Sequence, residues 1–163
     1  MPTQGPILRP LVVGANHRSA ALATREALFM TDARAALFLS RLRDAGIAQA
    51  VVMSTCDRVE VQAAVPDPES AARRIAALLA DEAGLDAAKL SSELYLLNDE
   101  AAVRHVFLVA AALDSQVVGE PNVSGQIKDA HRAAREAGMT GSELEAVLQA
   151  AYASAKRVRA ETA

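Results

Sequence analysis

The stretch "IAQAVVMSTCDRVEVQAAV", residues 47–65, decides the fold of this chain. Residues 47–55 are mostly apolar, which predicts a strand. In residues 58–65, apolar residues alternate with Glu60 and Gln62, which predicts a second strand that is half buried. Because only a few residues join the two strands, we expect an antiparallel hairpin with the single cysteine of the chain near its turn.

The segments around this hairpin complete a β-α-β-β-α-β order. We expect a strand and a helix before it and a helix and a strand after it, over 11–16, 32–46, 66–84 and 93–97. Asp32 is the expected N-cap of the first helix. The order predicts an α+β fold of the ferredoxin-like kind over residues 1–97, an antiparallel sheet with two helices on one face.

Residues 98–163 are predicted to be helical. The expected helices are 98–113, 123–138 and 141–162. Asn98 is the expected N-cap of the first, which is apolar almost all round and should therefore be buried. The last should open with a capping box formed by Ser142 and Glu145. A glycine and a proline break the pattern in 114–122.

The composition excludes several classes of protein. Hydrophobic residues make up 52% of the 163, which indicates a globular and not a disordered chain. The net charge of −3 argues against a protein that coats nucleic acid through bulk charge. One cysteine cannot form an internal disulfide, and no signal peptide or membrane-spanning run is evident. We expect a cytoplasmic protein with no membrane partner.

Taken alone, the polar residues of the chain leave alternatives open. Cys56 is either a small buried filler or a reactive thiolate. His105 is either a hydrogen-bonded core histidine or a catalytic base. Arg58 and Glu60 lie on one face of the predicted strand. They form either a plain ion pair or part of a binding site.

Four stretches together resemble the N-terminal catalytic domain of glutamyl-tRNA reductase. They are "GANHRSA…RE", "STCDRVE", "RHVFLVAAALDSQVVGEPNVSGQIKDA" and "SELEAVLQAAYASAKRVRAET", which lie in the same order and span nearly the whole chain. The resemblance implies an NADPH-dependent oxidoreductase of porphyrin biosynthesis that converts glutamyl-tRNA into glutamate-1-semialdehyde. Complete family members continue into an NADPH-binding domain and a dimerisation domain, and we expect neither within these 163 residues.

The resemblance implies a role for each matching residue. Cys56 matches the nucleophile that attacks glutamyl-tRNA and forms a thioester, and His105 matches the proposed base. Arg58 matches the residue that binds the substrate carboxylate. Glu60 would orient Arg58 or accept from the substrate ammonium. The other implied substrate-binding residues are Thr55, Ser115, Glu120, Gln126, Asn16 and His17, of which the last two are equally open to a turn-forming role.

Two positions depart from the family pattern. Asp57 stands where the family usually has asparagine, and its carboxylate should disfavour a thiolate at Cys56. Asn122 stands where glutamine is common.

Basic residues gather in the last two predicted helices: Lys128, Arg132, Arg135, Lys156, Arg157 and Arg159. They are either a solvated helix face or, for the tRNA-dependent enzyme that the resemblance implies, contacts to the tRNA backbone through charge. The resemblance also implies glutamate-1-semialdehyde aminomutase as a partner and a dimer in full-length members. One Cys and three scattered His predict no metal site. Two alternatives to the reductase remain, a stand-alone thioesterase or acyl-transfer module and a non-catalytic regulator that binds tRNA or a reductase.

Overall fold

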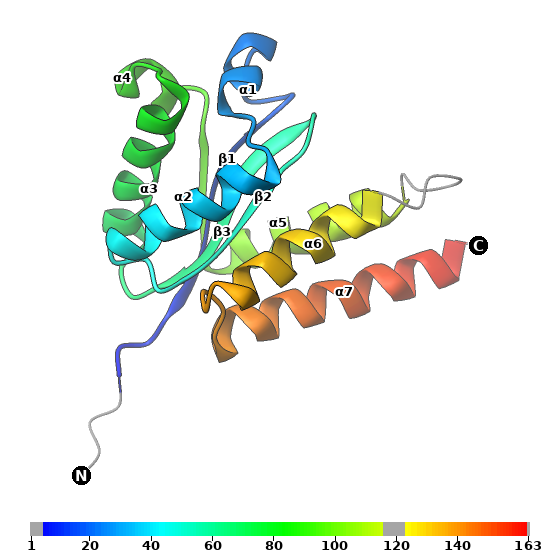
Figure 1. The fold of residues 1–163 in the computed structure, drawn as a ribbon. Coiled ribbons are helices and arrows are strands. Elements are labelled where there is room, and N and C mark those ends of the chain that lie inside the picture. Colours follow the sequence, from blue (N-terminus) through cyan, green and yellow to red (C-terminus); the bar gives the residue numbers. More distant parts are fainter. Residues whose placement is uncertain (1–4, 116–122, 163) are drawn as a thin grey trace.

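The computed structural model describes residues 5–115 and 123–162, which are built around a four-stranded antiparallel sheet (Figure 1). The strands stand in the order β2-β3-β1-β4. Their bounds are β1 (Arg9–Asn16), β2 (Gln49–Ser54), β3 (Arg58–Val65) and β4 (Tyr95–Asn98). The predicted β2–β3 hairpin is present, and its register pairs Ser54 with Val59 next to the turn. The α+β fold of the ferredoxin-like kind is therefore confirmed.

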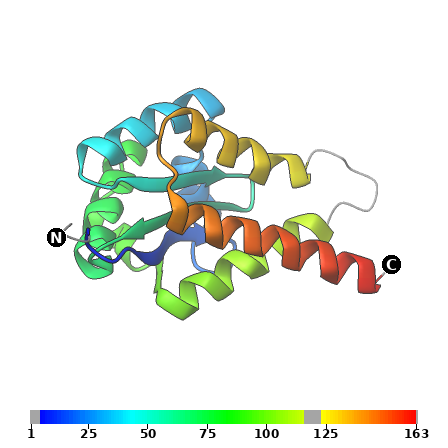
Figure 2. The ribbon, with the colours of Figure 1, turned by 90° about the horizontal axis from the view of Figure 1, so that it is seen from below.

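Helices cover both faces of the sheet (Figures 1 and 2). One face is covered by α2 (Asp32–Asp44) and α3 (Pro68–Ala83), and the other by α5 (Asp99–Ser115), α6 (Val123–Glu136) and α7 (Ser142–Thr162). Two short helices that the sequence analysis did not predict lie in the connections, α1 (Leu22–Leu28) and α4 (Ala87–Ser91). Within the described residues, no helix is both long and apolar enough to cross a membrane.

Strand β3 is buried on both faces, which corrects the prediction that it is half buried. Glu60 has no exposed surface, and Gln62 is only 2% exposed. The alternation of the sequence is real, because the polar residues do share one face. That face meets α5 and α7 in place of water, so the polar side chains must find partners inside the protein.

Two predicted helix starts are wrong by one position. The Thr31 hydroxyl accepts from the backbone N–H of Arg34 at 3.3 Å, so Thr31 caps α2 and Asp32 is its first helical residue. Helix α7 already includes Ser142, and the amide oxygen of Gln49 accepts from the backbone N–H of Leu144 at 3.1 Å. A side chain from β2 therefore satisfies the start of α7.

The predicted capping box of α7 is absent because Glu145 bonds elsewhere. Its carboxylate accepts from Arg135 Nε at 2.6 Å and lies 2.8 Å from His131 Nε2. These bonds tie α7 to α6. Helix α5 begins directly after Asn98, but its expected burial all round is wrong at Leu108, which is 63% exposed.

Candidate functional site

The turn of the β2–β3 hairpin presents Cys56 at the surface. The Thr55 backbone N–H donates to the Arg58 carbonyl at 2.8 Å. The Thr55 hydroxyl accepts from the backbone N–H groups of Asp57 and Arg58, each at 3.2 Å. Cys56 and Asp57 are the central turn residues and both are exposed. The Thr55 hydroxyl, expected to bind substrate, therefore shapes the turn in this structure.

The loop after β1 begins beside the hairpin turn, because the register pairs Asn16 with Arg58. Asn16 Oδ1 accepts from the backbone N–H of Arg18 at 2.9 Å and of Ser19 at 3.1 Å. Asn16 is thus a turn former, which was one of the two roles left open for it. His17 is exposed in the same loop, at the end of the sheet that carries Cys56.

Glu60 is the centre of a buried polar cluster on β3. Its Oε1 accepts from the Tyr95 hydroxyl at 2.6 Å and lies 3.0 Å from His105 Nε2 and 3.4 Å from Arg58 Nη1. Its Oε2 accepts from Gln62 Nε2 at 2.8 Å. Glu60 therefore lies where it can orient Arg58, which is one of the two roles expected of it, and it has no exposed surface.

The Glu60 cluster favours the ionised carboxylate. Burial is the largest single influence and raises the pKa of Glu60. The hydrogen bond and charge of His105, with hydrogen bonds from Gln62 and Tyr95, outweigh burial and bring the pKa below its ordinary value. Burial and the Glu60 charge raise the pKa of Tyr95, so its hydroxyl remains a donor. The Arg58 side chain is paired with the ionised Glu60 carboxylate and is 14% exposed.

The structure does not place His105 in a hydrogen bond with the Cys56 thiol. Among the described residues, the hydrogen bond of the His105 ring is to Glu60. The His105 side chain is 17% exposed, so it reaches both the cluster and the surface. Cys56 begins the hairpin segment that continues through Arg58 to Glu60. The residues expected to be nucleophile, carboxylate-binding group and base thus gather at one end of the sheet.

The remaining expected substrate-binding residues lie in the sequence between the last residue of α5 and the start of α6. The backbone of Ser115 ends α5, but its side chain is outside the described part of the chain, and so are Glu120 and Asn122 entirely. Gln126 is exposed near the start of α6. Because the Ala50 N–H bonds to the Met139 carbonyl just beyond the other end of α6, the start of α6 points toward the hairpin turn (Figure 1).

The basic residues differ in how available they are. Arg135 holds Glu145 with two bonds, at 2.6 and 2.9 Å, and so belongs to the α6–α7 contact. Arg132 makes an exposed ion pair with Asp129. Among the described residues, five expected tRNA contacts are exposed, and all but Arg135 are free of the Glu145 pair: Lys128, Arg132, Arg135, Lys156 and Arg157. The Arg159 side chain lies outside the described residues.

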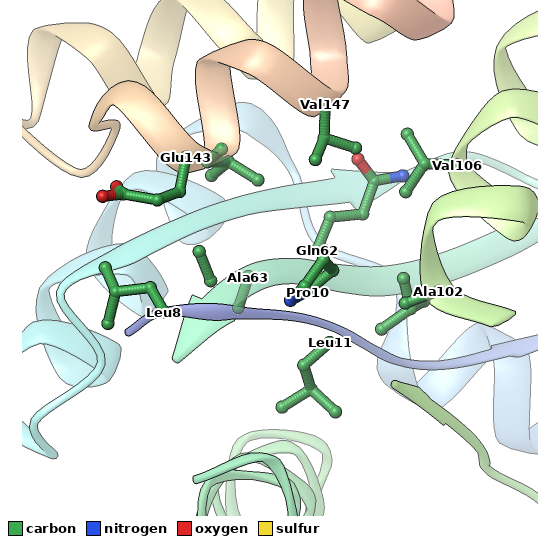
Figure 3. Close-up of a pocket in the computed structure, with 12 residues that line it drawn as sticks. Leu8, Pro10, Leu11, Gln62, Ala63, Ala102, Val106, Glu143 and Val147 are labelled. Carbon is green, nitrogen blue, oxygen red and sulfur yellow. The ribbon is translucent and has the colours of Figure 1, made fainter. Parts of the chain in front are cut away.

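A cavity of about 160 Å³ lies on the same sheet face, between β1, β3, α5 and α7 (Figure 3). Its lining is apolar apart from Gln62 and Glu143, and neither Cys56 nor His105 belongs to it. We therefore place the candidate site at the hairpin end of the sheet and not in this cavity.

One site residue was missed from the sequence. Tyr95 lies in β4 and bonds to Glu60, and its position in a predicted strand was the available signal. Arg25 of α1 belongs to the stretch "GANHRSA…RE" but had no predicted role, and it donates to the Cys56 carbonyl at 3.5 Å. Among the described residues, no group of three or more His, Cys, Asp or Glu could hold a metal ion.

Known proteins that resemble this chain identify its family. The family model described as "Glutamyl-tRNAGlu reductase, N-terminal domain" matches residues 13–162. The chain belongs to this family. A curated glutamyl-tRNA reductase of Rhodospirillum rubrum is 44% identical over 152 residues, which cover 93% of this chain and 35% of the relative. That of Rubrobacter xylanophilus is 42% identical over 152 residues, with the same coverage.

A solved structure gives the same family. Glutamyl-tRNA reductase from Methanopyrus kandleri matches with a TM-score of 0.70 at 28% sequence identity, over 93% of this chain and 34% of that one. The chain thus spans about a third of the length of the glutamyl-tRNA reductases that it matches.

Proposed function

We propose that this domain takes the glutamyl group from glutamyl-tRNA onto Cys56 as a thioester. The observation that carries the proposal is the hairpin end of the sheet. There an exposed thiol lies two residues from Arg58, whose guanidinium is set against a buried carboxylate beside His105. Family membership supplies the substrate, because the matching proteins are named glutamyl-tRNA reductases.

The chemical step is an acyl transfer. A base removes the Cys56 proton, and the thiolate attacks the ester carbonyl carbon. The carbon–sulfur bond forms, the bond from that carbon to the tRNA ribose oxygen breaks, and the oxygen takes up a proton. We assign the base to His105. Arg58 binds the substrate side-chain carboxylate, for which a guanidinium offers two parallel donors.

The described residues do not fit NADPH. Dinucleotides bind at a glycine-rich loop between a parallel strand and a helix, and the sheet here is antiparallel throughout. We therefore derive no reduction step in this chain. We propose that residues 1–97 and 98–163 form one catalytic unit of a longer cytoplasmic, dimeric reductase. There NADPH bound elsewhere would reduce the thioester to glutamate-1-semialdehyde, which the aminomutase of tetrapyrrole biosynthesis would take up.

The deciding test is the intact mass of the chain after mixing with glutamyl-tRNA and no NADPH. We expect a glutamyl adduct that Cys56→Ser abolishes, with release of uncharged tRNA. Deacylation of the tRNA without an adduct, lost in Cys56→Ala, would identify a thioesterase. Binding of tRNA with neither adduct nor deacylation would identify a non-catalytic regulator. Both of the last two outcomes contradict the proposal.

A further inference from the structure

A row of three residues crosses the sheet at the Glu60 cluster. The register pairs Gly14 of β1 with Glu60 of β3 on one side and with Tyr95 of β4 on the other. Residues in one row point to the same face of a sheet. Because β1 separates β3 from β4, Glu60 and Tyr95 stand two strand spacings apart, about 10 Å, before their side chains extend.

Gly14 makes the contact across β1 possible. A Cβ built on Gly14 would overlap the Glu60 Cβ and the backbone of Val59 and Glu60. With no side chain in the middle of the row, the Tyr95 hydroxyl reaches over β1 to within 2.6 Å of Glu60 Oε1. The glycine is needed here for close approach and not for an unusual backbone conformation.

Tyr95 contacts both partners of the histidine–carboxylate pair. Its ring centroid lies 4.9 Å from that of His105, with the two rings tilted by 49°. Its hydroxyl bonds to the same Glu60 oxygen that lies 3.0 Å from His105 Nε2. The other Glu60 oxygen is held by Gln62. Tyr95 therefore fixes where the carboxylate stands and limits how the imidazole can turn.

The arrangement also decides which nitrogen of His105 carries a proton. An ionised carboxylate only accepts hydrogen bonds, so the bond at Nε2 requires an Nε2–H. In the neutral ring Nδ1 is then the unprotonated nitrogen. Among the described residues, Arg58 Nη1 also lies 3.4 Å from the Glu60 oxygen that His105 faces. On α6 and α7, which also pack near α5, the buried His131 is held by Tyr152 and Glu145.

We propose that Tyr95 is a positioning residue of the acyl-transfer site. Its hydroxyl passes over Gly14 and donates a hydrogen bond to the Glu60 carboxylate. The carboxylate in turn accepts from the Nε2–H of His105, which leaves Nδ1 unprotonated and able to accept the Cys56 proton. The inference rests on the proposed function for its consequence, but its geometry can be tested without substrate.

The first experiment follows the His105 ring by ¹⁵N NMR on this chain. We expect the Nε2–H tautomer in the unmodified protein, and a mixture of tautomers in Glu60→Gln, whose amide both donates and accepts. Tyr95→Phe keeps the ring and removes the donor, so the carboxylate loses its fixed position. The Nε2 proton should then exchange with water about tenfold faster.

The matched control is Tyr152→Phe, which removes a tyrosine hydroxyl from the His131–Glu145 cluster away from the candidate site. It should leave the His105 signals unchanged. An Nδ1–H tautomer in the unmodified protein, or identical His105 exchange in Tyr95→Phe and Tyr152→Phe, would overturn the positioning role.

The second experiment measures the rate of adduct formation with glutamyl-tRNA at pH 7. In Tyr95→Phe the Glu60 carboxylate and the His105 ring lose their fixed position, so a smaller share of molecules holds Nδ1 where it can accept the Cys56 proton. We therefore expect adduct formation to slow roughly threefold with unchanged tRNA affinity. A rate in Tyr95→Phe equal to that in Tyr152→Phe would refute the inference. No adduct in the unmodified protein would refute the proposed function instead, while the NMR result would still judge the geometry.

Discussion

Asp57 and Arg58 follow Cys56 directly, and the two side chains differ in how strongly they are held. Arg58 is mostly buried and set against Glu60, so its charge acts from a fixed position. Asp57 is exposed, and its backbone N–H donates to the Thr55 hydroxyl. Water and salt therefore screen the Asp57 charge. Its opposition to a Cys56 thiolate should be weak, which makes the departure from the family asparagine compatible with a reactive thiol.

Asp57→Asn should raise the rate of Cys56 alkylation by iodoacetamide at neutral pH and low salt by about two- to fivefold. A screened unit charge at this separation is worth only about 0.5–1 kcal/mol. The rate is measured by intact mass. The control, Asp44→Asn, removes an exposed carboxylate at the end of α2 and should change nothing. An increase of a hundredfold or more, or one that persists in high salt, would show that Asp57 is a strong suppressor of the thiol.

Arg58→Lys should slow adduct formation with glutamyl-tRNA by about 10- to 100-fold. Lysine keeps the charge but loses the forked donor, and a charge-assisted hydrogen bond contributes roughly 1.5–3 kcal/mol. Single-turnover mixing without NADPH gives the rate. Iodoacetamide has no carboxylate to bind, so its reaction with Cys56 serves as the internal control and should be unaffected. Equal loss in both reactions would mean that Arg58 acts on the thiol and not on the substrate.

Helices α6 and α7 are joined by a second polar cluster, His131–Glu145–Tyr152, with Arg135 on its outer side. The hydrogen bond from Arg135 is the main reason why the pKa of Glu145 falls to about 2, against burial and with help from His131. A carboxylate whose pKa is lowered on folding stabilises the fold above its ordinary pKa of 4.5. That contribution is lost as the pH falls toward 2.

Glu145→Gln should therefore lower the free energy of unfolding by about 1–2 kcal/mol at pH 7, after allowance for the partial exposure of the group. The difference from the unmodified protein should shrink as the pH falls from about 4.5 to about 2. Urea unfolding at pH 7 and pH 3 tests both statements. Glu136→Gln, an exposed carboxylate at the end of α6, is the control. A pH-independent loss in Glu145→Gln would contradict the ionic origin of the effect.

The same elements show what local pattern can and cannot predict. Strand β3 was predicted with its observed bounds because period-two alternation is a backbone property. Its exposure was not predictable, because the pattern of Glu60 and Gln62 is the same whether helices or water cover that face. The capping box failed similarly: Glu145 suits a helix start, but His131 and Arg135 from α6 bind it. Tertiary partners decided both cases.

At the level of the whole molecule, the hairpin turn, the start of α6 and the end of α7 lie toward one side (Figures 1 and 2). Of the exposed cations, Lys128 lies in the first half of α6 and Arg132 one turn further along it, and Lys156 and Arg157 lie in the last part of α7. A tRNA whose charged 3′ end reaches Cys56 would pass along these helices. The net charge of −3 does not oppose this, because backbone contact depends on local charge.

The pairs Lys128→Gln/Arg132→Gln and Lys156→Gln/Arg157→Gln should each weaken tRNA binding. Each removed phosphate contact lowers the slope of log affinity against log salt by about 1, so each pair should lower it by about 2. Fluorescence titration of labelled tRNA at several salt concentrations measures the slope. Arg73→Gln/Lys89→Gln removes two exposed cations from α3 and α4, on the other side of the sheet, and should leave it unchanged. If all three pairs reduce the slope equally, the attraction is general and α6 and α7 do not form the tRNA contact surface.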